Sequence, residues 1–339
     1  MILIRADANE RIGAGHVMRC LTAARALRER GENILFVTAD RRSLPPIERA
    51  GFPAVCLGTA PENIEDGADK IAALLQENAP ALLLTDSYAV TEGYFRALAP
   101  YGKLAYFDDL NRATWDVDLL INYNLFFAVF NYGGYEGTRT RLLLGPAYAP
   151  LREEFRHLPP RAAEETVTDV FVSAGAADPA RVTEKMLQYL CPAFPEVTFH
   201  FVVGGMNPRL GEIRALAGQN AALHVDETRM AARMTSCGAA VSAAGATLYE
   251  LCACGVPTLA YALADNQLAA VERFAAEGLM RSAGDCRGDG GFIGRLRTEL
   301  AAMLADRAER ERMSRAMRTL ADGSGADRIA EAMIQTLHG

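Results

Sequence analysis

A histidine that directly follows two glycines is the first candidate for chemistry in this sequence. In the stretch 11-RIGAGHVMRC-20, Gly13 and Gly15 precede His16, and a helix-forming run begins at once. Glycines let a backbone approach a substrate closely, and the positive end of a helix dipole disfavours an imidazolium in the first turn. His16 is therefore expected to be neutral and able to accept a proton as a general base. A histidine that only caps the helix would fit the position equally well.

Two further features bear on this turn. Asp7 ends the first apolar run and is close enough in sequence to orient the His16 ring. The glycines also match part of the dinucleotide fingerprint G-x-G-x-x-G, but Met18 stands where the third glycine would be, and two arginines follow the acidic Asp40. The pattern therefore favours a substrate site around His16 over a nicotinamide site.

A second candidate site lies in 239-AAVSAAGATLYELCACGVPTLAYALADNQ-267. An apolar strand runs into the small residues Gly245, Ala246 and Thr247, and a helix follows. The free amides of a helix N-terminus favour a diphosphate at such a turn. Glu250 is then placed to accept hydrogen bonds from a ribose diol, although a carboxylate in the first turn is also favourable for the helix alone.

Polar groups from two other segments are expected near this turn. Asn266 and Gln267 open the helix that follows the next strand, so they belong to the same edge of the sheet. Arg152, in the connection between the two halves, is a candidate for a phosphate or carboxylate contact, although a surface arginine is the commoner case.

These residues stand where buried strands end. Short apolar runs alternate with helical patterns, such as residues 16–31, which is typical of parallel sheets covered by helices on both faces. Ligands of such sheets bind at the carboxyl ends of the strands. The expected strands are 1–8, 32–39, 53–58, 81–87, 103–109, 118–124 and 141–145 in the first half, and 168–175, 197–205, 221–227, 237–245 and 256–263 in the second.

The alternation pauses between residues 146 and 167, where prolines and charges are typical of an interdomain connection. Near the end, the charge-dense stretch 305–323 indicates a solvated amphipathic helix. The expected fold class is α/β, with two doubly wound domains that face each other across a cleft. The expected units are a Rossmann-like domain over 1–150 that carries the histidine, a Rossmann-like ligand-binding domain over 165–320, and a C-terminal helix over 321–339.

Composition narrows the class of partner. The 339 residues carry a net charge of −7, which argues against nucleic acid or an anionic membrane and favours a small-molecule substrate. No apolar run reaches the roughly 18 residues of a membrane span, and the N-terminus does not read as a signal peptide, so a cytoplasmic location is expected. The seven cysteines lack metal-ligand spacing and are expected to be reduced. Neither a metal nor a cofactor is expected.

Several segments carry a resemblance to a known family. The second half resembles nucleotide-sugar enzymes of the GT-B fold, among them glycosyltransferases related to the lipid II GlcNAc transferase. With the first half included, the chain is similar to the UDP-2,4-diacetamido-2,4,6-trideoxy-β-L-altropyranose hydrolases of pseudaminic acid biosynthesis (PseG). The segments that carry the likeness are 5-RADANERIGAGHVMRCLTAARAL-27, 84-LTDSY-88, 107-FDDLNRATWDVDLLINYNL-125, 144-LGPAYAPLREEF-155 and 242-SAAGATLYELCACGVPTLAYALADNQ-267.

The resemblance implies roles for individual residues. His16 is the implied general base, and Asp7 is the expected partner of its ring. The implied ligand is a UDP-sugar, with UDP in the second domain. The expected contacts to it are Gly13, Gly15, Tyr88, Arg152, Gly245, Ala246, Thr247, Glu250, Asn266 and Gln267.

The implied reaction is hydrolysis. Water cleaves the anomeric C–O bond of a UDP-linked 2,4-diacetamido-2,4,6-trideoxy sugar with inversion, and UDP and the free sugar are released. No metal is required, because helix amides hold the departing diphosphate. A GT-B glycosyltransferase, in which another hydroxyl replaces water, is one alternative. A catalytically silent nucleotide-sugar binding protein is the other.

Overall fold

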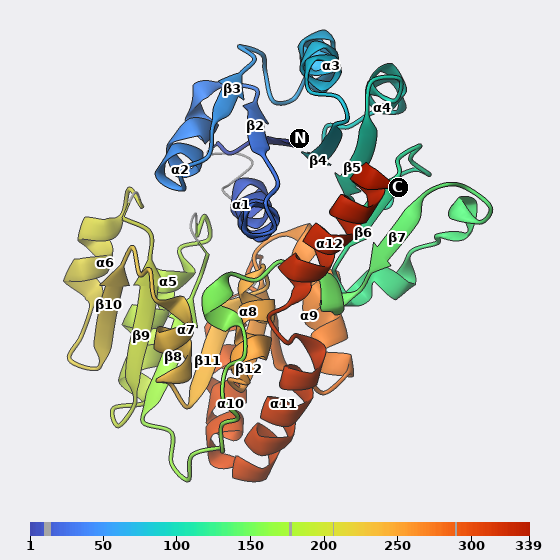
Figure 1. Cartoon of the computed structure of the whole chain (residues 1–339). Helices are drawn as coiled ribbons and strands as arrows, with labels where there is room; N and C mark the ends of the chain where they lie inside the picture. The colour runs from blue at the N-terminus through green and yellow to red at the C-terminus, as the bar shows by residue number, and fades with distance from the viewer. Residues whose placement is uncertain (10–14, 176–177, 206, 289) are drawn as a thin grey trace. The chain divides into compact units, whose positions relative to one another are not determined.

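The chain forms two compact units. The computed structural model describes residues 1–9, 15–175, 178–205, 207–288 and 290–339 (Figure 1). The first unit comprises Met1–Arg152 together with Ser324–Gly339, and the second comprises Glu153–Gly323. The chain therefore leaves the first unit once and returns to it for its last helix.

The first unit contains a seven-stranded parallel sheet with the order β3-β2-β1-β4-β5-β6-β7. The chain runs outward from β1 to β3 and then crosses to β4, so the order reverses between β1 and β4. This reversal is the switch point of a doubly wound sheet. The strands are β1 Ile2–Ala6, β2 Ile34–Thr38, β3 Ala54–Cys56, β4 Leu82–Asp86, β5 Lys103–Phe107, β6 Leu119–Asn122 and β7 Arg141–Leu144.

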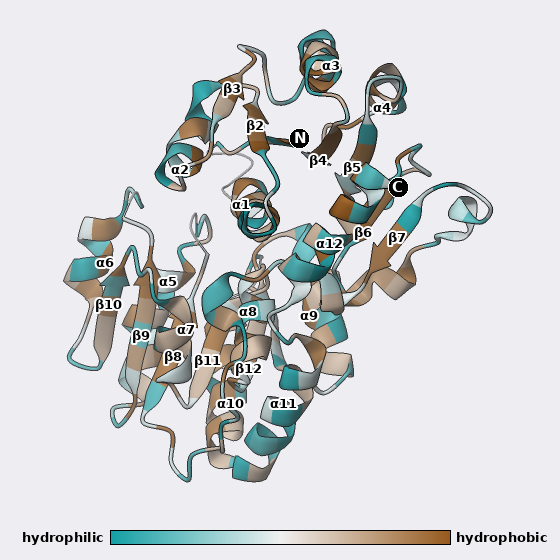
Figure 2. Ribbon diagram, viewed as in Figure 1, coloured by the Kyte–Doolittle hydropathy of each residue, from teal (hydrophilic) through white to brown (hydrophobic). Residues whose placement is uncertain are grey.

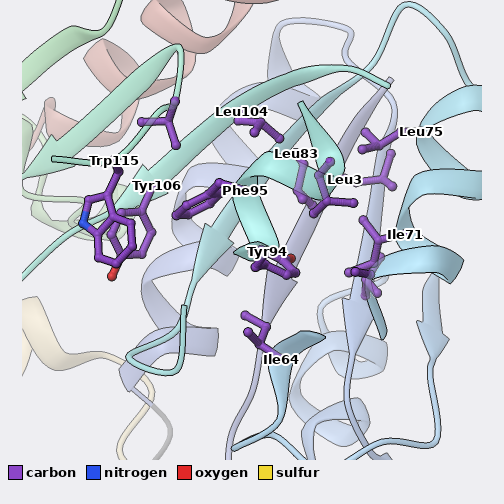
Figure 3. Packing of buried hydrophobic residues seen from close by; sticks show 14 of the residues in the cluster. Leu3, Ile64, Ile71, Leu75, Leu83, Tyr94, Phe95, Leu104, Tyr106 and Trp115 are labelled. Carbon is purple, nitrogen blue, oxygen red and sulfur yellow. The ribbon is translucent and has the colours of Figure 1, made fainter. Parts of the chain in front are cut away.

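Helices cover the first sheet on both faces. Figure 3 shows the core beneath α3 and α4, where Tyr94 and Phe95 pack with Leu3, Leu83 and Trp115. Helices α1 and α12 pack against each other in the same unit. The helices are α1 Gly15–Glu29, α2 Leu44–Arg49, α3 Ala68–Glu77, α4 Glu92–Leu98 and α12 Gly325–His338, with short turns at Arg41–Ser43, Ile64–Gly67, Leu125–Val129, Gly133–Tyr135 and Pro146–Tyr148.

The second unit repeats the same plan. Its six-stranded parallel sheet has the order β10-β9-β8-β11-β12-β13, with its switch point between β8 and β11. The expected α/β class with two doubly wound domains is therefore confirmed. The strands are β8 Asp169–Ser173, β9 Thr198–Val203, β10 Ala221–Val225, β11 Ala239–Ala243, β12 Thr258–Ala262 and β13 Arg281–Asp285.

One strand of this sheet had no signal in the sequence. Strand β13 has the sequence RSAGD, which lacks both the apolar run and the alternation expected of a strand. It pairs in parallel with β12, so the neighbouring strand rather than its own composition determines its conformation.

One helix of the second unit, α11 (Arg307–Leu320), has an exposed charged face and a buried face, as expected of an amphipathic helix. Helix α11 is mostly hydrophilic (Figure 2), but it buries Met313, Met317 and the charged Arg310. Arg310 donates from its Nη1 to the carbonyl oxygen of Met303 at 3.1 Å and from its Nη2 to that of Glu164 at 2.8 Å, so both terminal amino groups are hydrogen-bonded inside the fold. The helices are α5 Val182–Lys185, α6 Leu210–Leu216, α7 Met230–Thr235, α8 Thr247–Cys254, α9 Asp265–Ala276, α10 Phe292–Ala305 and α11 Arg307–Leu320, with short turns at Glu153–Phe155, Met186–Leu190 and Cys191–Ala193.

Two general expectations can be compared with the described part of the chain. All seven cysteines are free thiols, as expected. Within the described ranges, no helix combines the length and the apolar character that crossing a bilayer requires.

The close packing of α12 against the rest of the first unit gives a stability prediction. A Cβ atom at Gly325 would overlap the backbone carbonyl of Ala149, whereas a Cβ at Gly294, inside α10, would meet nothing within 4 Å. We expect Gly325→Ala to destabilise the first unit by about 1–3 kcal/mol, because backbone must move. Gly294→Ala, the matched control, should stabilise its helix by up to about 1 kcal/mol. Calorimetric unfolding of both variants checks this, and equal transition temperatures would contradict the packing argument.

Candidate functional site

The strongest polar cluster of the first unit lies at its switch point. Strand β1 leads into α1, whose first turn carries His16, and β4 ends at Asp86. Strands β1 and β4 are neighbours, with Ala6 opposite Asp86 in the register. The topology therefore brings His16 and Asp86 together at the sheet edge where doubly wound folds bind ligands.

His16 and Asp86 form a buried pair. The Nδ1 atom of His16 lies 2.5 Å from Oδ1 of Asp86, and the side chains are 7% and 0% exposed. In the neutral ring, a proton on Nδ1 is donated to the carboxylate, which leaves Nε2 as the basic nitrogen. We call this pair the dyad. Its carboxylate orients the ring and stabilises the imidazolium that forms when Nε2 takes up a proton.

Arg19 holds the carboxylate of the dyad from the same helix. Its Nε donates to Oδ2 of Asp86 and its Nη2 to Oδ1, both at 2.6 Å. Burial alone would raise the pKa of Asp86, but the Arg19 guanidinium and the His16 ring hold that pKa well below its ordinary value. Asp86 is therefore an ionised partner for His16 over the whole working range of pH.

A second carboxylate, Asp109, completes the cluster. Arg19 Nη1 lies 2.8 Å from Oδ2 of Asp109, and the hydroxyl of Tyr88 donates to the same oxygen at 3.0 Å. The ring of Tyr88 meets the His16 ring edge-on, with centroids 4.7 Å apart. Asn124 donates to the other oxygen of Asp109 at 2.9 Å. Asp109 thus links Arg19, Tyr88 and Asn124 around the dyad.

Asp7 does not have the role that its position in the sequence suggested. Its carboxylate forms an ion pair with Arg5 and accepts the amide of Ala39 at 2.7 Å. Arg5 lies on β1 and Asp7 directly follows this strand, two residues further on, so the two side chains can meet on the same face. The carboxylate beside His16 is Asp86, and Asp7 instead ties the end of β1 to the segment after β2.

The remaining predicted residues of the first unit have different positions. Tyr88 is 38% exposed beside His16. Gly15 begins α1, and a Cβ there would meet nothing within 4 Å. Arg152 is half-buried at the end of this unit. Gly13 lies outside the described residues.

The predicted ligand turn of the second unit lies at the corresponding sheet edge. Strand β11 ends at Ala243, and the exposed Gly245 and Ala246 lead into α8. A Cβ at Gly245 would meet nothing within 4 Å, so the turn faces open space. Thr247 and Glu250 are half-buried on α8. This turn therefore presents small residues and the positive end of the α8 dipole to an approaching group.

The next turn of this edge adds one exposed amide. Strand β12 pairs with β11 and leads to α9, which begins at Asp265. Asn266 is exposed on its first turn. The side-chain oxygen of Gln267 accepts the amide of Leu263 at 2.8 Å, so this residue closes its own turn. Among the described residues, no three His, Cys, Asp or Glu side chains converge to hold a metal ion.

Asp86, Arg19 and Asp109 were not identified as site residues from the sequence. A signal for two of them exists in hindsight. Arg19 lies three residues after His16, which places both on one face of a helix, and Asp86 is the first acidic residue after the apolar run of β4. The pairing of these carboxylates with Arg19 and His16 depends on the order of the strands, which a local sequence pattern does not specify.

Comparisons with known proteins give distant relatives. No protein-family model matches the chain. It is 24% identical over 272 residues to the uncharacterized protein MJ1062 of Methanocaldococcus jannaschii, a match that covers 76% of this chain and 54% of that protein. It is 26% identical over 210 residues to the spore coat polysaccharide biosynthesis protein SpsG of Bacillus subtilis, covering 60% and 58%. The chain thus spans little more than half the length of the curated relatives it matches.

Solved structures resemble the whole chain at low sequence identity. The calicheamicin glycosyltransferase CalG4 gives a TM-score of 0.67 with 18% identity, over 99% of this chain and 98% of that one. The glycosyltransferase SsfS6 of Streptomyces sp. SF2575, complexed with thymidine diphosphate, gives 0.60 with 18% identity, over 98% and 99%. A putative UDP-N-acetylglucosamine 2-epimerase from Listeria monocytogenes gives 0.65 with 12% identity, over 99% and 96%. These similarities show that the chain has the GT-B fold.

Proposed function

We propose that this protein is an enzyme that acts on a nucleotide-sugar and that His16 is its general base. The observation that carries the proposal is the buried dyad at the switch point of the first sheet. An imidazole whose Nδ1 is held by an ionised carboxylate is arranged to take a proton at Nε2. In the proposed reaction, this proton comes from the hydroxyl group that attacks the sugar.

The proposed step is a displacement at the anomeric carbon. The attacking oxygen forms a bond to this carbon as its proton moves to Nε2 of His16. The bond from the carbon to the phosphate oxygen breaks on the opposite side, so the configuration inverts, and the nucleoside diphosphate leaves with the electron pair. Asp86 stabilises the imidazolium formed in this step, and its depressed pKa means that it stays ionised while His16 is protonated.

The proposal assigns the nucleotide, UDP, to the second unit. The open turn at Gly245 suits a diphosphate, because nothing in the protein fills the space beside it and the positive end of the α8 dipole favours an anion. Glu250, half-buried on the same helix, is the proposed partner of the ribose diol, and Asn266 adds a polar contact from the neighbouring turn. The thymidine diphosphate in SsfS6 supports a nucleoside diphosphate as the ligand class.

Water is the first candidate for the attacking hydroxyl. The motifs around His16 and the segments in matching order resemble hydrolases of a UDP-linked 2,4-diacetamido-2,4,6-trideoxy sugar, in which water is the acceptor. On this proposal the products are UDP and the free sugar. The fold does not decide the matter, because the GT-B structures above include a putative epimerase as well as glycosyltransferases.

Transfer to a sugar or another hydroxyl compound is the second candidate. Both CalG4 and SsfS6 are glycosyltransferases, and SpsG is named for polysaccharide biosynthesis. On these comparisons alone, transfer is at least as well supported as hydrolysis. The dyad would serve both reactions, since each requires an incoming hydroxyl to lose a proton.

The base assignment predicts a loss of turnover without a loss of nucleotide binding. In His16→Asn, the amide can still donate to Asp86 from near the position of Nδ1, but the basic Nε2 is gone. We expect turnover to fall by about 10²- to 10⁴-fold, the usual contribution of a general base. UDP affinity, measured by calorimetry, should stay at the wild-type value. A variant that turns over at the wild-type rate would remove His16 from the mechanism.

The nucleotide assignment predicts an effect of bulk at Gly245. Because a Cβ there meets nothing in the protein, Gly245→Val should leave the unfolding temperature unchanged. It should weaken UDP at least 10-fold, about 1.4 kcal/mol, because the side chain occupies the space of the phosphates. Gly218→Val, at another exposed glycine of the same unit, is the matched control and should bind UDP normally. Equal affinities in the two variants would contradict the assignment.

The attacking hydroxyl is identified by isotope labelling. We expect the UDP-linked 2,4-diacetamido-2,4,6-trideoxy sugar, incubated without acceptor in ¹⁸O-water, to yield UDP and a sugar labelled at its anomeric hydroxyl. Activity should survive EDTA. Release of UDP only when an acceptor hydroxyl is added would identify a transferase. Binding of UDP with no release under either condition would identify a silent binding protein, and label in the phosphate would contradict attack at carbon.

A further inference from the structure

The cluster around Arg19 holds two carboxylates for one guanidinium. Asp86 is 0% exposed, Arg19 is 9% exposed and Asp109 is 13% exposed. With His16 neutral, these groups carry a net charge of −1. When His16 takes up a proton, the cluster becomes neutral. Without Asp109, the same event would take a neutral cluster to +1, which is costly away from water.

The geometry divides Arg19 between its two partners. Its Nε and Nη2 donate to Asp86, and the remaining amino group, Nη1, faces Asp109. Arg19 Nη2 also lies 3.4 Å from Nδ1 of His16, so its positive charge opposes protonation of the ring. Asp109 offsets that charge from the far side of the guanidinium. Both carboxylates raise the pKa of Arg19 against the effect of its burial, so Arg19 remains charged throughout.

We propose that Asp109 is a positioning residue that sets the charge of the dyad: because Asp109 shares the positive charge of Arg19 with Asp86, the cluster keeps one net negative charge for the protonated His16. The proposal rests on the proposed role of His16 as the base. No contact joins Asp109 to His16 among the described residues, so its effect passes through Arg19 and through Tyr88, whose hydroxyl it holds beside the ring.

Other titratable groups also face the cluster: burial raises the pKa values of the Tyr106 hydroxyl and of the Asp108 carboxyl next to Asp109. Burial raises the pKa values of Cys20, Tyr88 and Tyr123 above their ordinary values, so all three stay neutral. Cys20 donates to Asp86 at 3.5 Å, and Tyr123 accepts from Arg19 at 3.1 Å. Histidine is the side-chain type that ordinarily changes charge near neutral pH, so the test follows His16.

The experiment follows the protonation of His16 directly. The full-length protein is labelled with ¹⁵N-histidine, and the signal of His16 among the five histidines is assigned by its loss in His16→Asn. In Asp109→Asn, which keeps the size of the side chain but removes its charge, we expect the midpoint of the His16 titration to fall by about one pH unit. Asp109→Glu keeps the charge and should titrate close to wild type.

A matched control and a variant of opposite sign complete the test. Asp116 is 72% exposed and forms a surface ion pair with Arg139. Asp116→Asn removes this distant carboxylate and should leave the midpoint of the His16 titration unchanged. Arg19→Gln removes the opposing positive charge and should move the midpoint to higher pH. Asp109→Ser, which is also neutral, replaces Asp109→Asn if that variant does not fold, and it should lower the midpoint in the same way. An unchanged midpoint in Asp109→Asn, or equal shifts in Asp109→Asn and Asp109→Glu, would overturn the proposal.

The readout separates this inference from the proposed function. The titration needs no substrate, so it decides the role of Asp109 even if no nucleotide-sugar is turned over. If the enzyme is active, Asp109→Asn should also move the acid limb of the kcat/KM profile to lower pH and reduce kcat about 10-fold. An active enzyme with an unchanged titration in Asp109→Asn would keep His16 as the base and remove Asp109 from the mechanism.

Discussion

The ion pair between Arg19 and Asp86 is the interaction on which the candidate site depends. A carboxylate without solvent exposure is stable only when opposite charge and hydrogen bonds replace its water. Arg19 supplies both through two bonds of 2.6 Å. Because Arg19 comes from α1 and Asp86 from β4, the same pair fixes the helix against the strand. The position of His16, one turn before Arg19, follows from this attachment.

The doubly wound topology explains why charge accumulates at this point. At a switch point, the connections that follow two neighbouring parallel strands lead to opposite sides of the sheet, which leaves space at the carboxyl ends of these strands. In the first unit this edge holds Asp86 and the first turn of α1, and in the second it holds the turn at Gly245. The first turn carries a buried charged cluster, and the second carries small exposed residues. The proposed function assigns proton transfer to the first edge and anion binding to the second.

Residues outside the dyad are linked to it through Arg19. Asp109 touches Arg19, Tyr88 and Asn124, and Arg19 in turn touches the dyad. Phe107 lies 4.8 Å from the guanidinium carbon of Arg19, which adds an apolar wall and a cation–π contact. Such surroundings limit the screening of charges by water, which strengthens the electrostatic interaction between Asp109 and the groups around it.

The sequence by itself determined every strand except β13, the doubly wound class and the two glycine-containing turns before α1 and α8. Apolar runs and helix starts are local patterns, so they can be recognised without the fold. It pointed to His16 and Gly245 for the same reason. Only the tertiary structure decided that Asp86, 70 residues away, meets the ring while Asp7 pairs with Arg5. That choice depends on which strand lies beside β1. Strand β13 was likewise decided by its neighbour, since pairing with β12 compensates for a sequence with little strand character.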